Sequence, residues 1–449
     1  MRQMHSWIAG ATAGLGRSAT PGRDPALPAV RGLRARWTVR RTALAGMIGL
    51  YFTLGAAATP PLHPSLDGRV LCGYQGWLRT PKDFEGAGWR HCVRQRDGVW
   101  LPLTDYLPDV SEATPEERCR LPLACTNGVA EVVSADNRNT VNRHFGWMRQ
   151  YGIDGVFVQR FPVDMYHRNI VPSQPRASGD RVLGYCRDAA AANGRSYTLM
   201  YDLSGMGSNA DVVVIADWRH LVADGVVRGT NDVAWQYHNG KPVIAIWGVG
   251  FNDNRRYGLD ACERLVDFFK GEGYAVLLGL PFYWRTLKAD TVADARLHAV
   301  VRKADIVHSW SVGRFGDDKG VGRAEAVWRG DEAWCRENKL TFMPVVFPGF
   351  SWCNLKETKG GTPRRDGAFL WSQFAAAQRV GVGCVYVAMF DEVDEGTQIF
   401  KVNNAPPTGE GFTYLSYGPL PSDHYLWLTG EATRLFRSHQ SFPDIMPTR

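Results

Sequence analysis

Four carboxylates crowd into five positions near the C-terminus of this chain. Asp391, Glu392, Asp394 and Glu395 follow directly after the apolar run 383–389. Carboxylates this close raise one another's pKa and resist burial, so a strand that ends among them indicates a functional site. Glu392 and Glu395 are three residues apart and can project to one side of a turn, one as a general acid and the other as a base. Such a pair is what hydrolysis of a glycosidic bond requires.

Two other interpretations of this cluster remain open. Glu392 and Glu395 could begin a helix, because acidic side chains favour the positive end of the helix dipole. Asp394 could be a solvated or salt-bridged acid with no part in catalysis. The first interpretation is weaker, because the acids come directly after an apolar strand.

Alternating strands and helices are expected to position this cluster. Apolar β-rich runs are predicted at 70–74, 155–159, 197–201, 243–247, 275–280, 306–310, 342–347 and 384–389. Helical spacing of apolar residues is found at 140–151, 181–192, 259–270, 292–303, 324–337, 368–380 and 423–438. Eight strand-then-helix units predict an α/β protein, a single-domain (β/α)8 TIM barrel over residues 66–440. The proline-rich stretch 79–139 is predicted to be a long loop insertion after the first strand that covers the top of the barrel.

Residues just past the strands are the candidates for binding, because barrel enzymes carry their chemistry at the C-terminal strand ends. Aromatic side chains alternate there with acids, amides and arginine, a mixture typical of sugar recognition. The candidates for substrate binding are Tyr74, Trp77, Gln159, Arg160, Tyr201, Asp202, Trp247, Tyr283, Trp284, Trp310, Trp352 and Asp391.

Several of these candidates have a structural alternative. Trp247 and Trp310 could cap the barrel core, and Asp202 could cap the turn that follows its strand. Arg160 could pair with a structural acid.

The charge distribution argues against nucleic-acid binding. The net charge is +7, but residues 1–58 hold eight arginines and one acid, and the remainder holds 44 basic and 44 acidic residues. Histidines and cysteines show no metal-ligand spacing, so we expect no metal, and no motif indicates a nucleotide cofactor.

Residues 1–58 resemble a secretory signal preceded by an arginine-rich extension. The basic part ends at Arg40 and Arg41, an apolar run follows at 42–54, and small residues 55–58 precede Thr59. We therefore expect cleavage near Ala58, no membrane span after processing, and a secreted or periplasmic protein. An uncleaved N-terminal anchor is the alternative. Among nine cysteines, Cys119 and Cys125 flank a short loop and are the predicted disulfide of an exported protein.

The segment 390–399, with the sequence Phe-Asp-Glu-Val-Asp-Glu-Gly-Thr-Gln-Ile, resembles the catalytic signature of glycoside hydrolase family 99, the endo-α-mannosidases. The family signature reads Asn-Glu-Trp-His-Glu-Gly-Thr-Gln-Ile. The segments 73–77, 200–205 and 247–251 are similar to a bacterial branch called family 71/99-like. The most specific part of the resemblance is the pattern Glu-x-x-Glu-Gly-Thr-Gln of the family 99 signature. This chain matches it at Glu392, Glu395 and residues 396–398.

The resemblance implies a retaining (β/α)8 hydrolase of α-linked glycans that needs no metal. In this mechanism Glu392 would take the proton of the substrate 2-hydroxyl to form a 1,2-anhydro sugar. Glu395 would protonate the leaving oxygen and then act as a base. The chain departs from the signature at Asp391, Val393 and Asp394, which stand for Asn, Trp and His. A barrel that binds carbohydrate without turnover is the alternative function.

Overall fold

A computed structural model describes residues 61–167, 171–229, 232–358, 360–443 and 445–449. The predicted leader, residues 1–58, lies outside the described residues.

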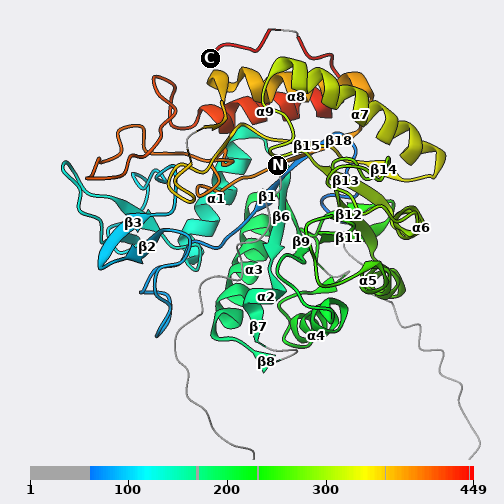
Figure 1. The fold of residues 1–449 in the computed structure, drawn as a ribbon, viewed down its shortest axis with the longest axis horizontal. Coiled ribbons are helices and arrows are strands. Elements are labelled where there is room, and N and C mark those ends of the chain that lie inside the picture. Colours follow the sequence, from blue (N-terminus) through cyan, green and yellow to red (C-terminus); the bar gives the residue numbers. More distant parts are fainter. Residues whose placement is uncertain (1–60, 168–170, 230–231, 359, 444) are drawn as a thin grey trace, which may run out of the picture. The chain divides into compact units, whose positions relative to one another are not determined.

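A parallel sheet of eight strands forms the centre of the described chain (Figure 1). Its strands in chain order are β1 (Arg69–Tyr74), β6 (Gly155–Arg160), β9 (Ser196–Asp202), β11 (Lys241–Trp247), β12 (Ala275–Pro281), β13 (Ile306–Trp310), the pair β14 (Thr341–Phe342) and β15 (Val345–Val346), and β18 (Cys384–Val387). Each strand pairs in parallel with the next one along the chain, and β18 pairs with β1, Arg69 opposite Cys384. The predicted (β/α)8 barrel and its eight strands are confirmed.

The seventh strand is broken in two at its middle, where Met343 and Pro344 separate β14 from β15. Proline has no N–H to give to a ladder, which interrupts the strand. β14 pairs with β13 and β15 pairs with β18. The two halves together close the ring, since Met343 N donates to Val307 O at 2.8 Å and Tyr386 N donates to Pro344 O at 3.0 Å.

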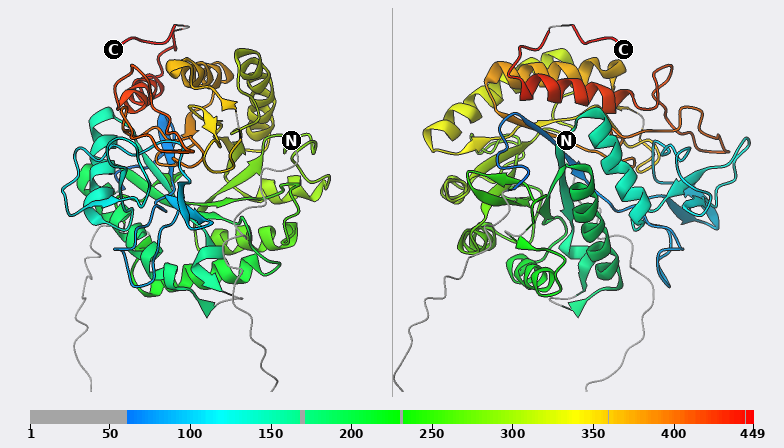
Figure 2. Two further views of the ribbon diagram at one scale, coloured as in Figure 1. Left: turned by 60° about the vertical axis from the view of Figure 1, so that its left-hand side comes forward. Right: turned by 180° about the vertical axis from the view of Figure 1, so that it is seen from behind.

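Helices surround the strands on the outside, as Figures 1 and 2 show from three directions. They are α1 (Arg138–Tyr151), α2 (Pro162–Met165), α3 (Gln174–Asn193), α4 (Ala210–Ala223), α5 (Leu259–Gly271), α6 (Arg296–Lys303), α7 (Asp318–Glu337), α8 (Ala368–Val380) and α9 (His424–Arg437). The seven predicted helices are confirmed with shifted ends, whereas α4 and the one-turn α2 were not predicted. Local capping sets α1, because the Asn137 side chain accepts from the N–H groups of Asn139 and Thr140, and Gly152 ends the helix with a φ of 80°.

The predicted insertion after β1 is present and carries two small hairpins. They are β2 (Val93–Arg96) with β3 (Val99–Pro102), and β4 (Arg118–Arg120) with β5 (Glu131–Val133). Bridges Tyr106–Leu415 and Cys125–Gly409 join the insertion to the loop before α9. In Figure 1 the two segments lie side by side, in blue-cyan and orange-brown. Smaller pairs are β7 (Tyr166–His167) with β8 (Val171–Pro172), β16 (Phe350–Ser351) with β17 (Gly361–Thr362), and β10 (Tyr237–His238) with β11.

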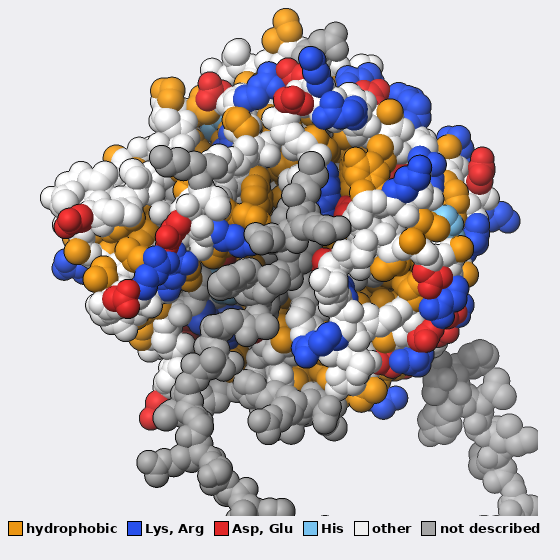
Figure 3. All heavy atoms as spheres, viewed as in Figure 1, with side chains coloured by type: hydrophobic (Ala, Val, Ile, Leu, Met, Phe, Trp, Pro, Cys, Tyr) orange, Lys and Arg blue, Asp and Glu red, His pale blue; other side chains and the backbone are white. Residues whose placement is uncertain are grey.

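The predicted disulfide is not formed. All nine cysteines lie in the described chain and all are free thiols, so Cys119 and Cys125 are not joined. Among the described residues no helix is both long and apolar enough to cross a membrane. On the face drawn in Figure 3, basic and acidic side chains are interspersed, in keeping with the balanced charge of this part of the sequence.

Candidate active site

The two candidate catalytic glutamates lie in the turns that follow β18, at the C-terminal end of the barrel. Residues 391–398 form no helix, which removes the interpretation of the acids as a helix N-terminus. Glu392 is buried, and both of its oxygens accept hydrogen bonds. Gln75 Nε2 donates to Oε1 at 2.6 Å and Thr397 Oγ1 donates to Oε2 at 2.6 Å.

Burial and neighbouring acids raise the pKa of Glu392 well above its ordinary value. Desolvation is the largest cause, followed by the charges of Glu395 and Asp394, and the hydrogen bonds from Thr397 and Gln75 act in the opposite direction. Removing a carboxylate from water penalises its charged form, which is the physical reason for the direction.

Glu395 is partly exposed, and its pKa is raised to about 7. Burial is the largest cause and the charge of Asp394 adds to it, while Trp352 and Lys356 lower the pKa. The ammonium of Lys356 lies 3.6 Å from the centre of the Trp352 ring, so this cation is held next to the site.

The two glutamates influence each other, so the second proton leaves less readily than the first. A pair in which one carboxyl is protonated and the other ionised near neutral pH can supply a general acid and a general base at once.

Asp391 fastens the turn that carries the glutamates to the end of β1. Its two oxygens accept from the backbone N–H groups of Gln75 at 2.7 Å and Gly76 at 2.8 Å. Burial raises the pKa of Asp391 to about 7. Because both oxygens are used by the main chain, Asp391 positions the turn, whereas the sequence placed it among the substrate-binding residues.

Arg364 holds the far side of the same turn. Its Nη2 donates to the carbonyl oxygens of Gly396 at 2.8 Å and Gln398 at 2.7 Å. The guanidinium also lies over the rings of Tyr106, Tyr417 and Tyr425, at 4.9, 5.0 and 4.6 Å from their centres. Gly396 has a φ of 64°, and a Cβ there would lie 3.1 Å from Ser351 Cβ, so the motif requires glycine at this position.

His91 reaches the site from the insertion. Its Nδ1 lies 3.0 Å from Asp394 Oδ2, and its ring stacks on Trp77 with centres 3.9 Å apart and planes at 5°. The other face of Trp77 is covered by Phe161 at 5.4 Å. Trp77 therefore lies at the site as predicted, but neither of its faces is free to stack on a sugar ring.

Several further candidates do lie at the barrel mouth. Gln159 donates through Nε2 to Tyr386 Oη at 2.9 Å, inside the barrel. Asp202 accepts from Ser204 N at 2.8 Å, which confirms its turn-capping alternative, and its charge also raises the pKa of Glu395. Trp247 and Trp310 meet edge to face at 5.2 Å. Trp310 stays partly exposed and Trp247 is buried.

Four further candidates are buried in contacts with other side chains, although Arg160 also lines a pocket beside the site. Tyr74 donates to or accepts from His144 Nδ1 at 2.9 Å, beneath α1. Arg160 is 3% exposed and pairs with Asp217 and Asp180, and Tyr201 donates to Asp217 at 2.8 Å. Trp284 is fully buried, edge to face with Trp334 at 4.9 Å. Alternation along a strand turns Tyr74, Arg160 and Tyr201 toward the helices, as for Tyr74 next to the inward-facing Gly73, whereas Trp284 lies beyond the end of β12. Tyr283 is partly exposed after β12, its N–H donating to Asp290 at 3.2 Å.

The structure adds four residues to the site that were not among the predicted site residues. Thr397 and Gln75 hold Glu392, and both stand in the quoted motifs. His91 and Lys356 lie in loops without a recognisable motif, so no sequence signal pointed to them.

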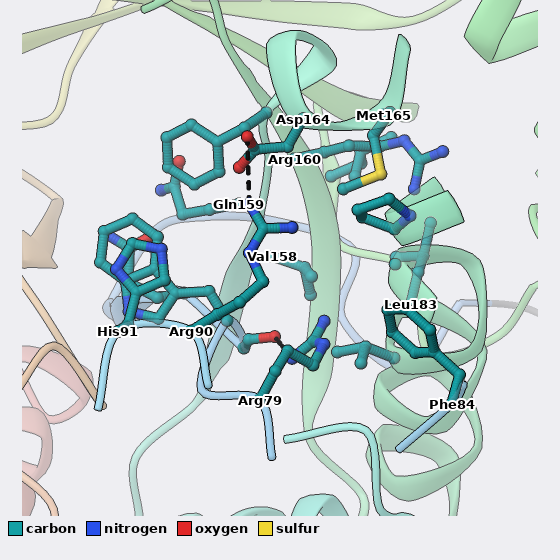
Figure 4. Close-up of a pocket in the computed structure, with 18 residues that line it drawn as sticks. Arg79, Phe84, Arg90, His91, Val158, Gln159, Arg160, Asp164, Met165 and Leu183 are labelled. Atoms are coloured by element: carbon teal, nitrogen blue, oxygen red, sulfur yellow. Dashed lines mark hydrogen bonds and ion pairs between the residues drawn. The ribbon is translucent and has the colours of Figure 1, made fainter. Parts of the chain in front are cut away.

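A pocket adjoins this site on the side of β6 and α3. Gln75, Trp77, Gln159 and His91 line it together with residues of the insertion. Figure 4 shows His91 at its edge and Arg90 reaching toward Asp164, a pair 3.2 Å apart. Within the described ranges no group of three or more His, Cys, Asp or Glu side chains could hold a metal ion.

The part of the chain that carries the two glutamates is similar to known proteins. Residues 316–438, which include both glutamates, match the sequence model of glycosyl hydrolase family 99. A glycoprotein endo-alpha-1,2-mannosidase-like protein of Danio rerio is 30% identical over 110 residues, 24% of either chain. The glycoprotein endo-alpha-1,2-mannosidase of Mus musculus is 28% identical over 117 residues, 26% of this chain and 25% of that one. The chain thus spans about a quarter of the length of these curated relatives.

The fold extends the similarity to the whole barrel. A solved family 99 endo-alpha-mannosidase from Bacteroides thetaiotaomicron superposes with a TM-score of 0.60 and 17% identity, over 83% of this chain and 99% of that one. At this identity the match concerns the fold alone. Residues 316–438 are thus similar in sequence to glycosyl hydrolase family 99, and the barrel is similar in fold to a solved endo-alpha-mannosidase of that family.

Proposed function

We propose that this protein is a retaining glycoside hydrolase that cleaves an α-linked glycan at the mouth of its barrel. The observation that carries the proposal is the pair Glu392 and Glu395, two carboxyls with raised pKa values at the end of β18. They stand in the segment that matches the family model.

The proposed reaction uses each glutamate in two steps. Glu392 takes the proton of the sugar 2-hydroxyl, and the freed oxygen attacks the anomeric carbon. The glycosidic C–O bond breaks, and the departing oxygen takes its proton from Glu395. In the second step Glu395 takes a proton from water, the resulting hydroxide opens the 1,2-anhydro sugar, and Glu392 returns its proton to the 2-oxygen. Two displacements at one carbon retain its configuration.

The contacts around the two carboxyls position Glu392 and leave Glu395 accessible. The donors Gln75 and Thr397 hold both oxygens of Glu392 in place and partly oppose the rise that burial causes in its pKa. Glu395 is more exposed, with Lys356 nearby, so water and a leaving group can reach it.

An α-mannoside is the first substrate to test, because the curated relatives are named for endo-alpha-1,2-mannosidase. Asp391, Val393 and Asp394 depart from the family signature, so α-glucans and xylans belong in the same panel. We also propose that the protein is exported, which rests on the signal-like pattern of residues 1–58.

The test is product release by the purified protein from this panel, beside Glu392→Gln and Glu395→Gln. Each variant should lose turnover by roughly 10³-fold or more, because it lacks a group that transfers a proton. Burial raises the pKa of both carboxyls in the folded protein, so their stabilising contribution is full below the unfolded value and is lost as pH rises toward the folded one. The glutamine variants should therefore unfold at the same temperature as wild type or higher at pH 8.

Other outcomes would contradict the proposal in different ways. Loss of turnover with a large fall in unfolding temperature would make the glutamates structural. Glycan binding by all three proteins without any product would instead support a carbohydrate-binding barrel that lacks turnover.

A further inference from the structure

The insertion brings an imidazole to the side of the glutamate pair. His91 is 28% exposed and is paired with Asp394, which is 4% exposed and lies between Glu392 and Glu395 in the chain. A carboxylate can only accept, so neutral His91 carries its proton on Nδ1 and leaves the lone pair of Nε2 free to accept. The orientation of this ring is fixed further by its stack on Trp77.

Two buried polar atoms next to His91 have no hydrogen-bond partner among the described residues. They are Nε1 of Trp77, a donor, and Oδ1 of Asp394, an acceptor. Oε1 of Gln75, whose Nε2 binds Glu392, is a third such atom. Buried polar groups are normally paired, and leaving one unpaired is costly. Their gathering beside the two glutamates therefore points to a ligand that supplies the missing hydrogen bonds.

A sugar hydroxyl has the chemistry that these atoms lack, because one hydroxyl both donates and accepts. The N–H of Trp77 is buried and unpaired, and the two faces of its ring are covered by His91 and Phe161. Indole N–H as donor, with carboxylate and imidazole nitrogen as acceptors, suits hydroxyl groups better than an apolar or an anionic substituent.

We propose that Trp77, His91 and Asp394 form a hydroxyl-binding subsite that selects the sugar next to the glutamate pair. This inference rests on the proposed function and adds a specificity-determining group to it. Asp394 and His91 act together. Asp394 supplies a carboxylate from the segment after β18, and His91 supplies an imidazole from the insertion.

The test is binding of an α-linked manno-oligosaccharide by calorimetry, in the Glu395→Gln protein so that binding is measured without turnover. Trp77→Phe keeps a ring between His91 and Phe161 and removes only the N–H and some ring area. Asp394→Asn keeps the shape and removes the charge. Each substitution should weaken the Kd about tenfold, the worth of one good hydrogen bond to a ligand. The double variant should lose less than the product of the two, because both groups serve one hydroxyl.

Trp100→Phe is the matched control, since Trp100 is a partly buried tryptophan of β3 in the same insertion. It should bind as the parent does. Unchanged Kd values in Trp77→Phe and Asp394→Asn, or an equal loss of affinity in Trp100→Phe, would overturn the subsite. If the wild type still cleaved the substrate, the proposed hydrolase function would stand without the subsite. Absence of both binding by the Glu395→Gln parent and cleavage by the wild type, across the substrate panel, would overturn the proposed function and the subsite with it.

Discussion

At the scale of single residues, the site is governed by charge around Glu395. Burial and Asp394 raise the pKa of this carboxyl to about 7, and Asp202 adds to the rise, whereas Lys356 lowers it. The sequence could not show these charge effects on Glu395, because Lys356 and Asp202 are more than 150 residues apart and come together only in the fold.

The proposed acid role makes the direction of these effects measurable. Activity should fall as pH rises through the upper pKa of the interacting pair, because the acid Glu395 then lacks its proton. Lys356→Met removes a positive charge, raises the pKa and should move this basic limb of kcat/KM to higher pH by roughly half a unit to one unit. Asp202→Asn should move it to lower pH by a similar amount. Lys303→Met, on the outer helix α6, should not move this limb, and shifts of the first two variants in the same direction would contradict the assignment.

At the scale of elements, the apolar runs predicted every barrel strand, because a parallel strand buried on both faces reads as a continuous apolar segment. Because both faces of such a strand are apolar, the sequence did not show which side chains point into the barrel and which point toward the helices. Tyr201 follows the inward-facing Met200, so it points outward to Asp217, yet nothing in an all-apolar strand reveals which face is inside. Helix α4 was missed because its β-branched run 212–215 obscures the helical period.

Packing between α1 and α9 gives a test at this scale. A Cβ on Gly430 of α9 would lie 2.0 Å from the carbonyl oxygen of Tyr151, so Gly430→Ala forces the two helices apart. We expect it to lower the free energy of unfolding by about 1–3 kcal/mol without changing kcat of the folded protein. In α3, nothing lies within 4 Å of a Cβ on Gly184, and Gly184→Ala should stabilise by up to about 1 kcal/mol. Chemical denaturation measures both, and equal effects of the two substitutions would contradict the packing argument.

At the scale of the whole molecule, the net charge of +7 resides in residues 1–58, and the rest of the chain is balanced. Cleavage near Ala58 should therefore convert a basic protein into one that focuses near neutral pH. Isoelectric focusing and the intact mass of the exported protein check this together. A basic isoelectric point with the full mass would favour the uncleaved anchor.

The break in the seventh strand has a dynamic consequence for the acid. β14 and β15 each pair over two residues, the shortest ladders of the barrel, so this seam is where the ring can open locally at least cost. The chain leaves β15 for β16, where Ser351 N donates to the carbonyl oxygen of Glu395 at 2.8 Å. Local opening of the seam would therefore move the backbone of Glu395, the proposed proton donor. Slow local opening of the barrel would in this way change the position of the one group that must meet the leaving oxygen.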